Sequence, residues 1–271
     1  MNKKTIGFIG SGNMGSAMIG GILAAGLVPA KQVIVADLNK EKLAEMKALY
    51  GITTTTEGRE VAQAADYLIL AVKPNVYAPV INSIKDLLTD GKVVISIAAG
   101  QSLAAIAAMA GETVKVVRTM PNTPALVEAG MAALCPNDKV SEEELANVKA
   151  IFESFGQAEV VPEYLIDGVI GISGSSPAYV FMFIEALADA GVLAGLPRQQ
   201  AMRFAAQAVY GSAKMVLETG KHPGELKDMV CSPGGTTIEA VATLEECGFR
   251  SAVIQAVNDC VAKSKAMSQK E

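Results

Sequence analysis

The sequence has no tryptophan, and only 5% of its 271 residues are aromatic. An aromatic surface for stacking bases is therefore not expected, and the many small apolar residues predict closely packed helices and strands. One histidine and four cysteines without a C-x-x-C pair do not supply a histidine- or cysteine-based metal cluster. We expect no bound metal and reduced, mostly buried thiols at Cys135, Cys231, Cys247 and Cys260.

Positive charge is also scarce, with a formal net charge of -5 and no cluster of lysine and arginine. Phosphate backbones bind to concentrated basic surfaces, so we expect no nucleic-acid partner. The apolar run after Lys3 and Lys4 is interrupted by Gly10 and Gly12, which makes it too short for a signal peptide or a membrane span. We therefore expect a cytoplasmic protein that does not bind membranes.

From residue 5 to about residue 161, short β-branched runs alternate with longer amphipathic segments, which predicts parallel strands joined by crossover helices. Because the runs are apolar on both faces, they predict central strands covered by helices on either side. The six predicted strands are 5–9, 32–36, 67–71, 93–98, 114–120 and 131–135. This pattern is typical of an α/β fold with a Rossmann-like doubly wound sheet, and we place a dinucleotide-binding domain at residues 1–162.

After Pro162 the pattern changes to helical periodicity, and we predict an all-helical domain at residues 163–271. The predicted helices are 177–193, 197–220, 223–230 and 238–247. Residues 178–196 are apolar almost all round, with Glu185 and Asp189 as their only charges. A helical layer of this size has more apolar surface than one chain can cover, so we expect this domain to form a homodimer.

A glycine-rich turn follows the first predicted strand and opens an apolar helix. It reads Gly10-Ser11-Gly12-Asn13-Met14-Gly15. The three glycines permit a tight turn, close approach of a pyrophosphate and packing of the helix on the strand. The helix N-terminus adds free N–H groups and the positive end of a dipole. The alternative is a tight strand-to-helix turn without a ligand, but the context favours dinucleotide binding.

An acidic residue, Asp37, follows the second predicted strand, 22 residues after Gly15. In a Rossmann sheet this position carries the carboxylate that accepts hydrogen bonds from the adenosine ribose, and it repels the 2′-phosphate of NADPH. Asn39, Lys40 and Lys42 are close in sequence and weaken the preference for NADH. The sequence therefore predicts NADPH or NADH as the cofactor.

A second turn, Ala71-Val72-Lys73-Pro74, follows the predicted strand at 67–71. Ligands bind at the carboxyl edge of the strands in open α/β sheets, so we expect this turn to lie beside the cofactor. Lys73 would contact ribose or phosphate groups there. The alternative is a solvated lysine at the start of a helix.

Two further stretches, 118–124 and 231–237, are rich in turn-forming and hydroxyl residues. In the second stretch Gly234 and Gly235 precede a predicted helix, so successive N–H groups can bind a small carboxylate. We expect an acidic substrate there, and the alternative is an ordinary capped helix start. His222, next to Pro223, is typical of an exposed helix start, so no strong proton donor accompanies this loop.

The lack of a proton donor favours one class of reduction. A ketone that accepts hydride becomes an alkoxide and needs a proton from a lysine or histidine, whereas a protonated imine is neutralised by the hydride itself. Thr236 and Thr237 are available to hydrogen-bond an imine nitrogen. We therefore predict hydride transfer to a C=N carbon, accelerated mainly by positioning.

Together these motifs resemble the pyrroline-5-carboxylate reductase family, nearly from end to end. The loop Ser232-Pro233-Gly234-Gly235-Thr236-Thr237, followed by Ile238-Glu239-Ala240, is the most specific part, and the N-terminal glycines are the least specific. The matching segments are 8–15, 71–74, 96–100, 120–124 and 232–237.

The resemblance implies reduction of the cyclic imino acid 1-pyrroline-5-carboxylate to L-proline by NAD(P)H, the last step of proline synthesis. It also implies a homodimer, which in some members assembles into a decamer of five dimers. The implied substrate-binding residues are Ser232, Gly234, Gly235 and Thr236 for the carboxylate, and the catalytic Thr237 for the ring nitrogen. The implied residues on the cofactor side are Ala71, Val72, Lys73, Pro74, Ala98, Ala99 and Asn122.

Two positions depart from the family pattern. Ser176 stands where the family usually has glycine, and Gly58 stands where an asparagine often lies near the adenosine. A β-hydroxyacid dehydrogenase is the runner-up, but that chemistry requires a lysine where this chain has Val180. The alternative from another class is a nucleotide sensor without turnover, which would have no need of the loop at 232–237.

Overall fold

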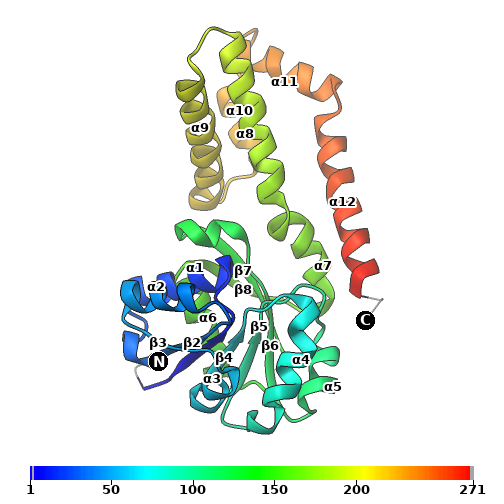
Figure 1. Ribbon diagram of the computed structural model, residues 1–271. Helices are drawn as coiled ribbons and strands as arrows, with labels where there is room; N and C mark the ends of the chain where they lie inside the picture. The colour runs from blue at the N-terminus through cyan, green and yellow to red at the C-terminus, as the bar shows by residue number, and fades with distance from the viewer. Residues whose placement is uncertain (2, 269–271) are drawn as a thin grey trace. The chain divides into compact units, whose positions relative to one another are not determined.

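The computed structural model describes residues 1 and 3–268 (Figure 1). Their contacts divide the chain into two compact units. The N-terminal unit comprises Met1–Gly174 together with the described residues from Val261 onward, and the helical unit comprises Ser175–Cys260. Each unit is described by itself below.

The N-terminal unit is built on an eight-stranded sheet with the strand order β3-β2-β1-β4-β5-β6-β7-β8. The strands are β1 (Ile6–Ile9), β2 (Val33–Ala36), β3 (Thr53–Thr55), β4 (Tyr67–Leu70), β5 (Val93–Ser96), β6 (Lys115–Met120), β7 (Gly130–Pro136) and β8 (Gly156–Val160). All six strands predicted from the sequence are present. The strand order reverses between β1 and β4, and such a switch point opens a ligand-binding crevice beyond the carboxyl ends of the two strands.

Two strands, β3 and β8, were not predicted from the sequence. β3 consists of three half-exposed or exposed threonines, and β8 has one buried residue, Ala158. Both lie at the ends of the strand order, where one side of the strand pairs with no neighbour. Edge strands need no continuous apolar run, so the signal that reveals central strands is missing from them.

The sheet is mixed rather than parallel throughout. β7 pairs antiparallel with β6, whereas the other strand pairs of the sheet are parallel. The expectation of a uniformly parallel sheet was therefore wrong at residues 131–135. The connection at 121–129 contains only the 3₁₀ helix η3 (Thr123–Val127), and parallel strands require a crossover of a dozen or more residues.

Helices cover both faces of the sheet (Figure 1). One core contains residues from α1 (Asn13–Ala24), α2 (Lys40–Tyr50) and α6 (Glu142–Glu153). The other contains residues from α3 (Gly58–Ala64), α4 (Pro74–Ile84) and α5 (Leu103–Ala110). Tyr67 and Ile69 of β4 enter the first core, and Leu68 and Leu70 enter the second. Burial on both faces explains why β1, β2 and β4 do not alternate between apolar and polar residues.

The N-terminal unit also contains short helical segments. η1 (Ala30–Gln32) and η2 (Lys85–Leu87) precede strands, and η4 (Glu163–Leu165) and α7 (Ile166–Val169) lead into a π-helix, η5 (Ile170–Gly174). Gly174 lies against the end of β6, since a Cβ on it would come within 2.6 Å of the Met120 methyl group. Single π-helical turns often occur at functional positions.

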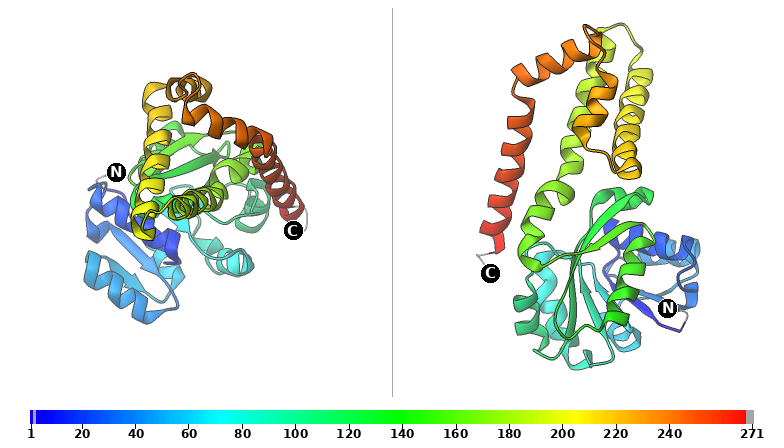
Figure 2. Two further views of the ribbon diagram at one scale, coloured as in Figure 1. Left: turned by 90° about the horizontal axis from the view of Figure 1, so that it is seen from above. Right: turned by 180° about the vertical axis from the view of Figure 1, so that it is seen from behind.

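The helical unit contains α8 (Ser176–Leu193), α9 (Arg198–Thr219), α10 (Pro223–Val230), α11 (Thr236–Glu246) and the first part of α12 (Phe249–Ser268). Ser176, which departs from the family pattern, begins α8. α8 and α9 lie side by side (Figures 1 and 2) around the buried Ala188, Ala201 and Ala205. Because alanines are buried where the two helices meet, their backbones can approach closely.

Large apolar side chains are exposed on the helical unit, as the sequence predicted. They include Phe181 (63% exposed), Met182 (70%), Phe204 (68%) and Tyr210 (59%). Among the described residues, one helical run, Glu163–Leu193, is long and apolar enough to cross a membrane, and 6% of its most apolar window is buried within the chain. A single such helix is weak evidence for a membrane span, because core helices of soluble proteins have the same length and composition.

Candidate functional site

The glycine loop has the geometry that its sequence predicted. Gly10 has a φ of +98°, and a Cβ on it would lie 2.5 Å from the Ala71 carbonyl oxygen. A Cβ on Gly15 would lie 2.8 Å from the Gly10 oxygen. Only glycine tolerates such contacts and the left-handed conformation at Gly10, so these two positions shape the turn between β1 and α1.

Gly12 is different, because it has free space around it. No atom lies within 4 Å of a Cβ built on Gly12, which is the N-cap residue of α1. In the part of the chain that the structure describes, no side chain caps α1, and its first turn contains no acidic residue. The open space and the uncapped N–H groups at Asn13, Met14 and Gly15 fit the pyrophosphate of a dinucleotide.

Asp37 is hydrogen-bonded to this loop. Its Oδ2 accepts from the Ser11 N–H at 2.7 Å and from the Ser11 hydroxyl at 2.6 Å, and its Oδ1 accepts from the Asn39 N–H at 2.9 Å. Burial opposes ionisation of Asp37, but these hydrogen bonds and the nearby Lys42 hold the pKa of its carboxyl below the ordinary value. The structure thus places Asp37 beside the glycine loop, and its contact with a ribose stays a prediction.

The other residues predicted on the cofactor side lie at the carboxyl ends of β4 and β5. Ala71 directly follows β4 and contacts the Gly10 position, and Ala98 is buried just after β5. Ala99 is exposed next to it. Lys73 is exposed and is the N-cap residue of α4, with Pro74 beginning that helix. Its surroundings therefore allow a ligand contact but do not require one.

Asn122 is engaged by the protein itself. Its side-chain Oδ1 accepts from the Met131 N–H at 2.9 Å, and its Nδ2 donates to the backbone oxygen of Ser173 at 3.2 Å and to the Ser173 hydroxyl at 3.3 Å. The amide thus ties the turn after β6 to β7 and to the π-helix η5. The predicted contact with the cofactor stays a prediction, and the side chain has a positioning role that the sequence did not reveal.

We expect Asn122→Ala to lower the free energy of unfolding by about 2 kcal/mol, because the half-buried Met131 N–H and Ser173 groups lose their partners. Amide hydrogen exchange should rise at Met131 and across residues 170–174. Asn122→Asp is the matched control: it keeps an acceptor for Met131 but loses the donor to Ser173, so exchange should rise only at 170–174. If exchange at Met131 rose equally in both variants, Asn122 would not act as an acceptor for Met131 and a donor to Ser173.

An ion pair near the same turn, between a buried arginine and a half-buried glutamate, was also not predicted from the sequence. Arg118 on β6 is 7% exposed, and its Nη1 donates to Glu163 Oε1 at 2.8 Å. The same oxygen accepts from the Leu103 N–H at 2.7 Å, at the start of α5. The pair therefore joins β6, α5 and the segment that leads to η5. The signal that could have revealed it was Arg118 itself, a basic residue that follows the apolar Val116 and Val117 in a central strand.

The loop predicted to bind the substrate lies in the helical unit, between α10 and α11. Gly234 has a φ of +64°, and the Gly235 N–H donates to the Ser232 oxygen at 3.0 Å, which closes the turn. α11 begins at Thr236, two residues earlier than the sequence predicted. Thr236 and Thr237 therefore lie in its first turn, where backbone N–H groups have no partner within the helix.

Ser232 and Thr236 are exposed, and Thr237 is half-buried. No side chain in the described residues caps α11. The turn and the helix start can thus accept a carboxylate through backbone N–H groups and hydroxyls. His222 caps α10, where its Nδ1 accepts from the Gly224 N–H at 3.1 Å, and it is exposed, as predicted.

The described residues offer no cluster for a metal ion, and the buried cysteine among them is unreactive. No group of three or more histidine, cysteine or acidic side chains is placed to hold a metal ion there. Cys135 is buried, and burial raises the pKa of its thiol to about 11, so it is unreactive. The expectation of mostly buried thiols was wrong, because Cys247 is exposed and Cys231 and Cys260 are half-buried.

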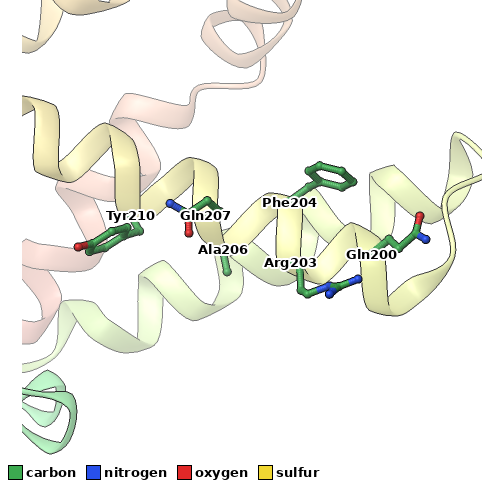
Figure 3. A pocket seen from close by; sticks show the side chains of 6 residues that line it. All are labelled: Gln200, Arg203, Phe204, Ala206, Gln207 and Tyr210. Carbon is green, nitrogen blue, oxygen red and sulfur yellow. The ribbon is translucent and has the colours of Figure 1, made fainter.

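A surface hollow of about 830 Å³ lies on the helical unit and is formed by one helix. Figure 3 shows its lining side chains, Gln200, Arg203, Phe204, Ala206, Gln207 and Tyr210, all projecting from α9. It shares no residue with the glycine loop or with the 232–237 loop. Exposed aromatic rings on one helix are typical of a protein contact rather than a small-molecule pocket.

Comparison with known proteins extends across both units. Residues 163–267 match the family model "Pyrroline-5-carboxylate reductase dimerisation", and residues 5–100 match "NADP oxidoreductase coenzyme F420-dependent". The pyrroline-5-carboxylate reductase of Escherichia coli (strain K12) is 55% identical over 267 residues, which are 98% of this chain and 99% of that protein.

Solved structures agree with these matches. A pyrroline-5-carboxylate reductase from Coxiella burnetii has a TM-score of 0.93 at 35% identity, covering 98% of this chain and 99% of that one. Pyrroline carboxylate reductase from Plasmodium falciparum, solved with NADP bound, has a TM-score of 0.89 at 35% identity and covers 99% of each chain. Since the match spans the glycine loop, the 232–237 loop and the helices between them, this chain belongs to the pyrroline-5-carboxylate reductase family.

Proposed function

We propose that this chain reduces 1-pyrroline-5-carboxylate to L-proline, with NADH or NADPH as the hydride donor, in the final step of proline synthesis. The observation that carries the proposal is the full-length match to a pyrroline-5-carboxylate reductase at 55% identity. The structure supports it with two uncapped helix N-termini suited to anions, one after Gly12 and one after Gly235.

On the cofactor side, the bound nicotinamide supplies the hydride. The N–H groups of Asn13, Met14 and Gly15 and the α1 dipole bind the pyrophosphate, while Ser11 holds Asp37, which faces the adenosine ribose. The residues at the ends of β4 and β5 hold the rest of the cofactor: Ala71, Val72, Lys73, Pro74, Ala98 and Ala99, together with the turn at Asn122. Their backbone, fixed by the sheet, sets the position of the reacting carbon.

On the substrate side, Ser232, Gly234, Gly235 and Thr236 bind the carboxylate through hydroxyls and backbone N–H groups. The Thr237 hydroxyl contacts the ring nitrogen and orients the C=N bond. A protonated imine loses its charge as it accepts hydride, so this site needs no strong acid, and the hydroxyl residues of the loop agree with that requirement.

We further propose that residues 1–162 form the dinucleotide-binding domain and residues 163–271 the substrate and dimerisation domain of a homodimer. The dimerisation model over residues 163–267 supports the dimer, and a second copy would cover the apolar residues of α8 and α9. A decamer of five dimers, a cytoplasmic location and the absence of membrane binding belong to the same proposal. Light scattering of the purified protein tests the assembly.

The test of the activity is the oxidation of NADH or NADPH at 340 nm on addition of 1-pyrroline-5-carboxylate. We expect Thr237→Ala to lower kcat/KM roughly 10- to 150-fold, which corresponds to a lost hydrogen bond of about 1.5 to 3 kcal/mol to a charged group. Affinity for the cofactor should not change. Thr237→Ser keeps a hydroxyl and should retain most of the activity.

Two results would oppose the assignment. An unchanged kcat/KM in Thr237→Ala would remove Thr237 from the site. Cofactor binding without turnover of any imine would instead favour a nucleotide sensor. A hydroxyacid dehydrogenase is disfavoured by Val180, an apolar residue in α8 at the position where that chemistry requires lysine.

A further inference from the structure

Hydrogen bonds to both the side chain and the backbone of Asp37 hold its carboxylate in place. Its side chain accepts three hydrogen bonds, two from Ser11 and one from the Asn39 N–H. The Asp37 N–H itself donates to the Thr55 oxygen of β3 at 3.3 Å. Ser11 is completely buried, so this anchor does not exchange readily with water. The charge therefore cannot swing aside to admit another negative group.

This fixed charge lies where the two nicotinamide cofactors differ. The residue after the second strand of a Rossmann sheet faces the 2′ position of the adenosine ribose, a hydroxyl in NADH and a phosphate in NADPH. Asp37 directly follows β2, and the Gly10 N–H donates to the Ala36 oxygen at 2.8 Å. Oδ1 of the carboxylate accepts one hydrogen bond and can accept another from a hydroxyl, but an ionised carboxylate has nothing to donate to a phosphate.

The neighbouring positive charges do not form a phosphate site. Binding of a 2′-phosphate generally uses an arginine, and Arg59 is the one arginine in the first 117 residues. Both of its terminal nitrogens donate to the Asp86 carboxylate at 2.7 Å, and one also donates to the Ser83 oxygen at 2.5 Å. Lys42 is half-buried near Asp37 and offsets part of the carboxylate charge, while Lys40 is exposed.

We propose that the hydrogen-bonded pair Ser11–Asp37 makes this enzyme select NADH over NADPH. Asp37 is the specificity-determining residue, and Ser11 is a positioning residue that acts by holding the carboxylate in place. The inference rests on the proposed function for its kinetic assay, and it deepens that function by choosing between the two cofactors.

The experiment measures kcat/KM for NADH and for NADPH with 1-pyrroline-5-carboxylate, and takes the ratio of the two values. The wild-type protein should favour NADH at least about tenfold, because a 2′-phosphate would lie beside an ionised carboxylate. Asp37→Ser should lower the ratio at least about tenfold, chiefly by improving NADPH, since the negative charge is removed and Lys42 remains. Damage to the loop alone would lower both values and leave the ratio unchanged.

Two further variants distinguish the effect of the Ser11 hydroxyl on Asp37 from the effect of removing any nearby negative charge. Ser11→Ala removes the hydroxyl but keeps the N–H, so the ratio should fall by less than in Asp37→Ser, roughly threefold, with NADH binding weakened. Glu41→Ser is the matched control, because it removes an exposed negative charge from the first turn of α2 without touching Ser11. Its ratio should equal that of the wild-type protein.

Direct titration of NADH and NADPH by fluorescence gives the same ratio without a substrate. If neither cofactor supports reduction of the imine, the proposed function fails while the titration still tests the cofactor selection. A wild-type preference for NADPH, or an Asp37→Ser ratio equal to the wild-type ratio in the titration, would overturn the inference.

Discussion

Gly10→Ala is expected to lower the free energy of unfolding by about 4 kcal/mol and to abolish measurable binding of NADH and NADPH. The methyl group would lie 2.5 Å from the Ala71 carbonyl oxygen and 2.8 Å from its carbonyl carbon, at a residue with a φ of +98°. Both contacts are with backbone of the adjoining strand end, which cannot move without breaking the Ala71 N–H bond to the Ile9 oxygen. Urea denaturation and fluorescence titration measure the two effects.

Gly12→Ala is the matched control, since the same methyl group is added two residues away. Its φ of -57° suits any residue, and no atom lies within 4 Å of the added carbon. The free energy of unfolding should change by no more than about 1 kcal/mol, the usual cost of alanine at an N-cap. Dinucleotide affinity should nevertheless fall, because the methyl group occupies the space meant for the pyrophosphate. Unimpaired binding in Gly12→Ala would place the phosphates elsewhere.

The second large effect is expected at Glu163. Glu163→Ala should lower the free energy of unfolding by about 3 kcal/mol, because it leaves the guanidinium of Arg118 buried without its partner. The Leu103 N–H loses its acceptor in the same variant. Glu163→Gln keeps a neutral acceptor for both donors and should cost clearly less. Urea denaturation of the three proteins gives the comparison.

A double-mutant cycle isolates the pair from general damage. Arg118→Met should be destabilising in the wild-type background. In the Glu163→Ala background it should recover about 1 kcal/mol or more, since it removes the unpaired charge. An equal cost of Arg118→Met in both backgrounds would show that the two residues are not coupled.

The glycine loop could be predicted from the sequence because each of its requirements is local. A strand, three glycines at fixed spacing and an apolar helix follow one another within twenty residues, and the turn geometry depends on those residues and the next strand end. Asp37 was found for the same reason, since its distance from Gly15 along the chain reflects one βα unit. The turn at 232–237 was also predicted locally, as a glycine pair before a helix, and its contact with a substrate stays a prediction.

The hydrogen bonds around the site could not be predicted in this way. Asn122 and Ser173 are 51 residues apart, and Arg118 and Glu163 are 45 residues apart. No periodicity connects such pairs, and they meet only because β6, β7 and η5 pack together. The direction of β7 was likewise not predictable from its apolar residues, because a parallel and an antiparallel strand would carry the same ones. The short connection between β6 and β7 decides it.

The sequence by itself determined the class of this protein. It contains central strands without apolar–polar alternation, a glycine loop of the dinucleotide-binding kind and a separate helical segment with an exposed apolar face. These follow from short-range chemistry, in which each residue acts through neighbours a few positions away. The tertiary structure decided the mixed sheet, the Arg118–Glu163 pair and the three hydrogen bonds that hold the Asp37 carboxylate. These depend on residues brought together from distant parts of the chain, and packing in three dimensions alone specifies which of them meet.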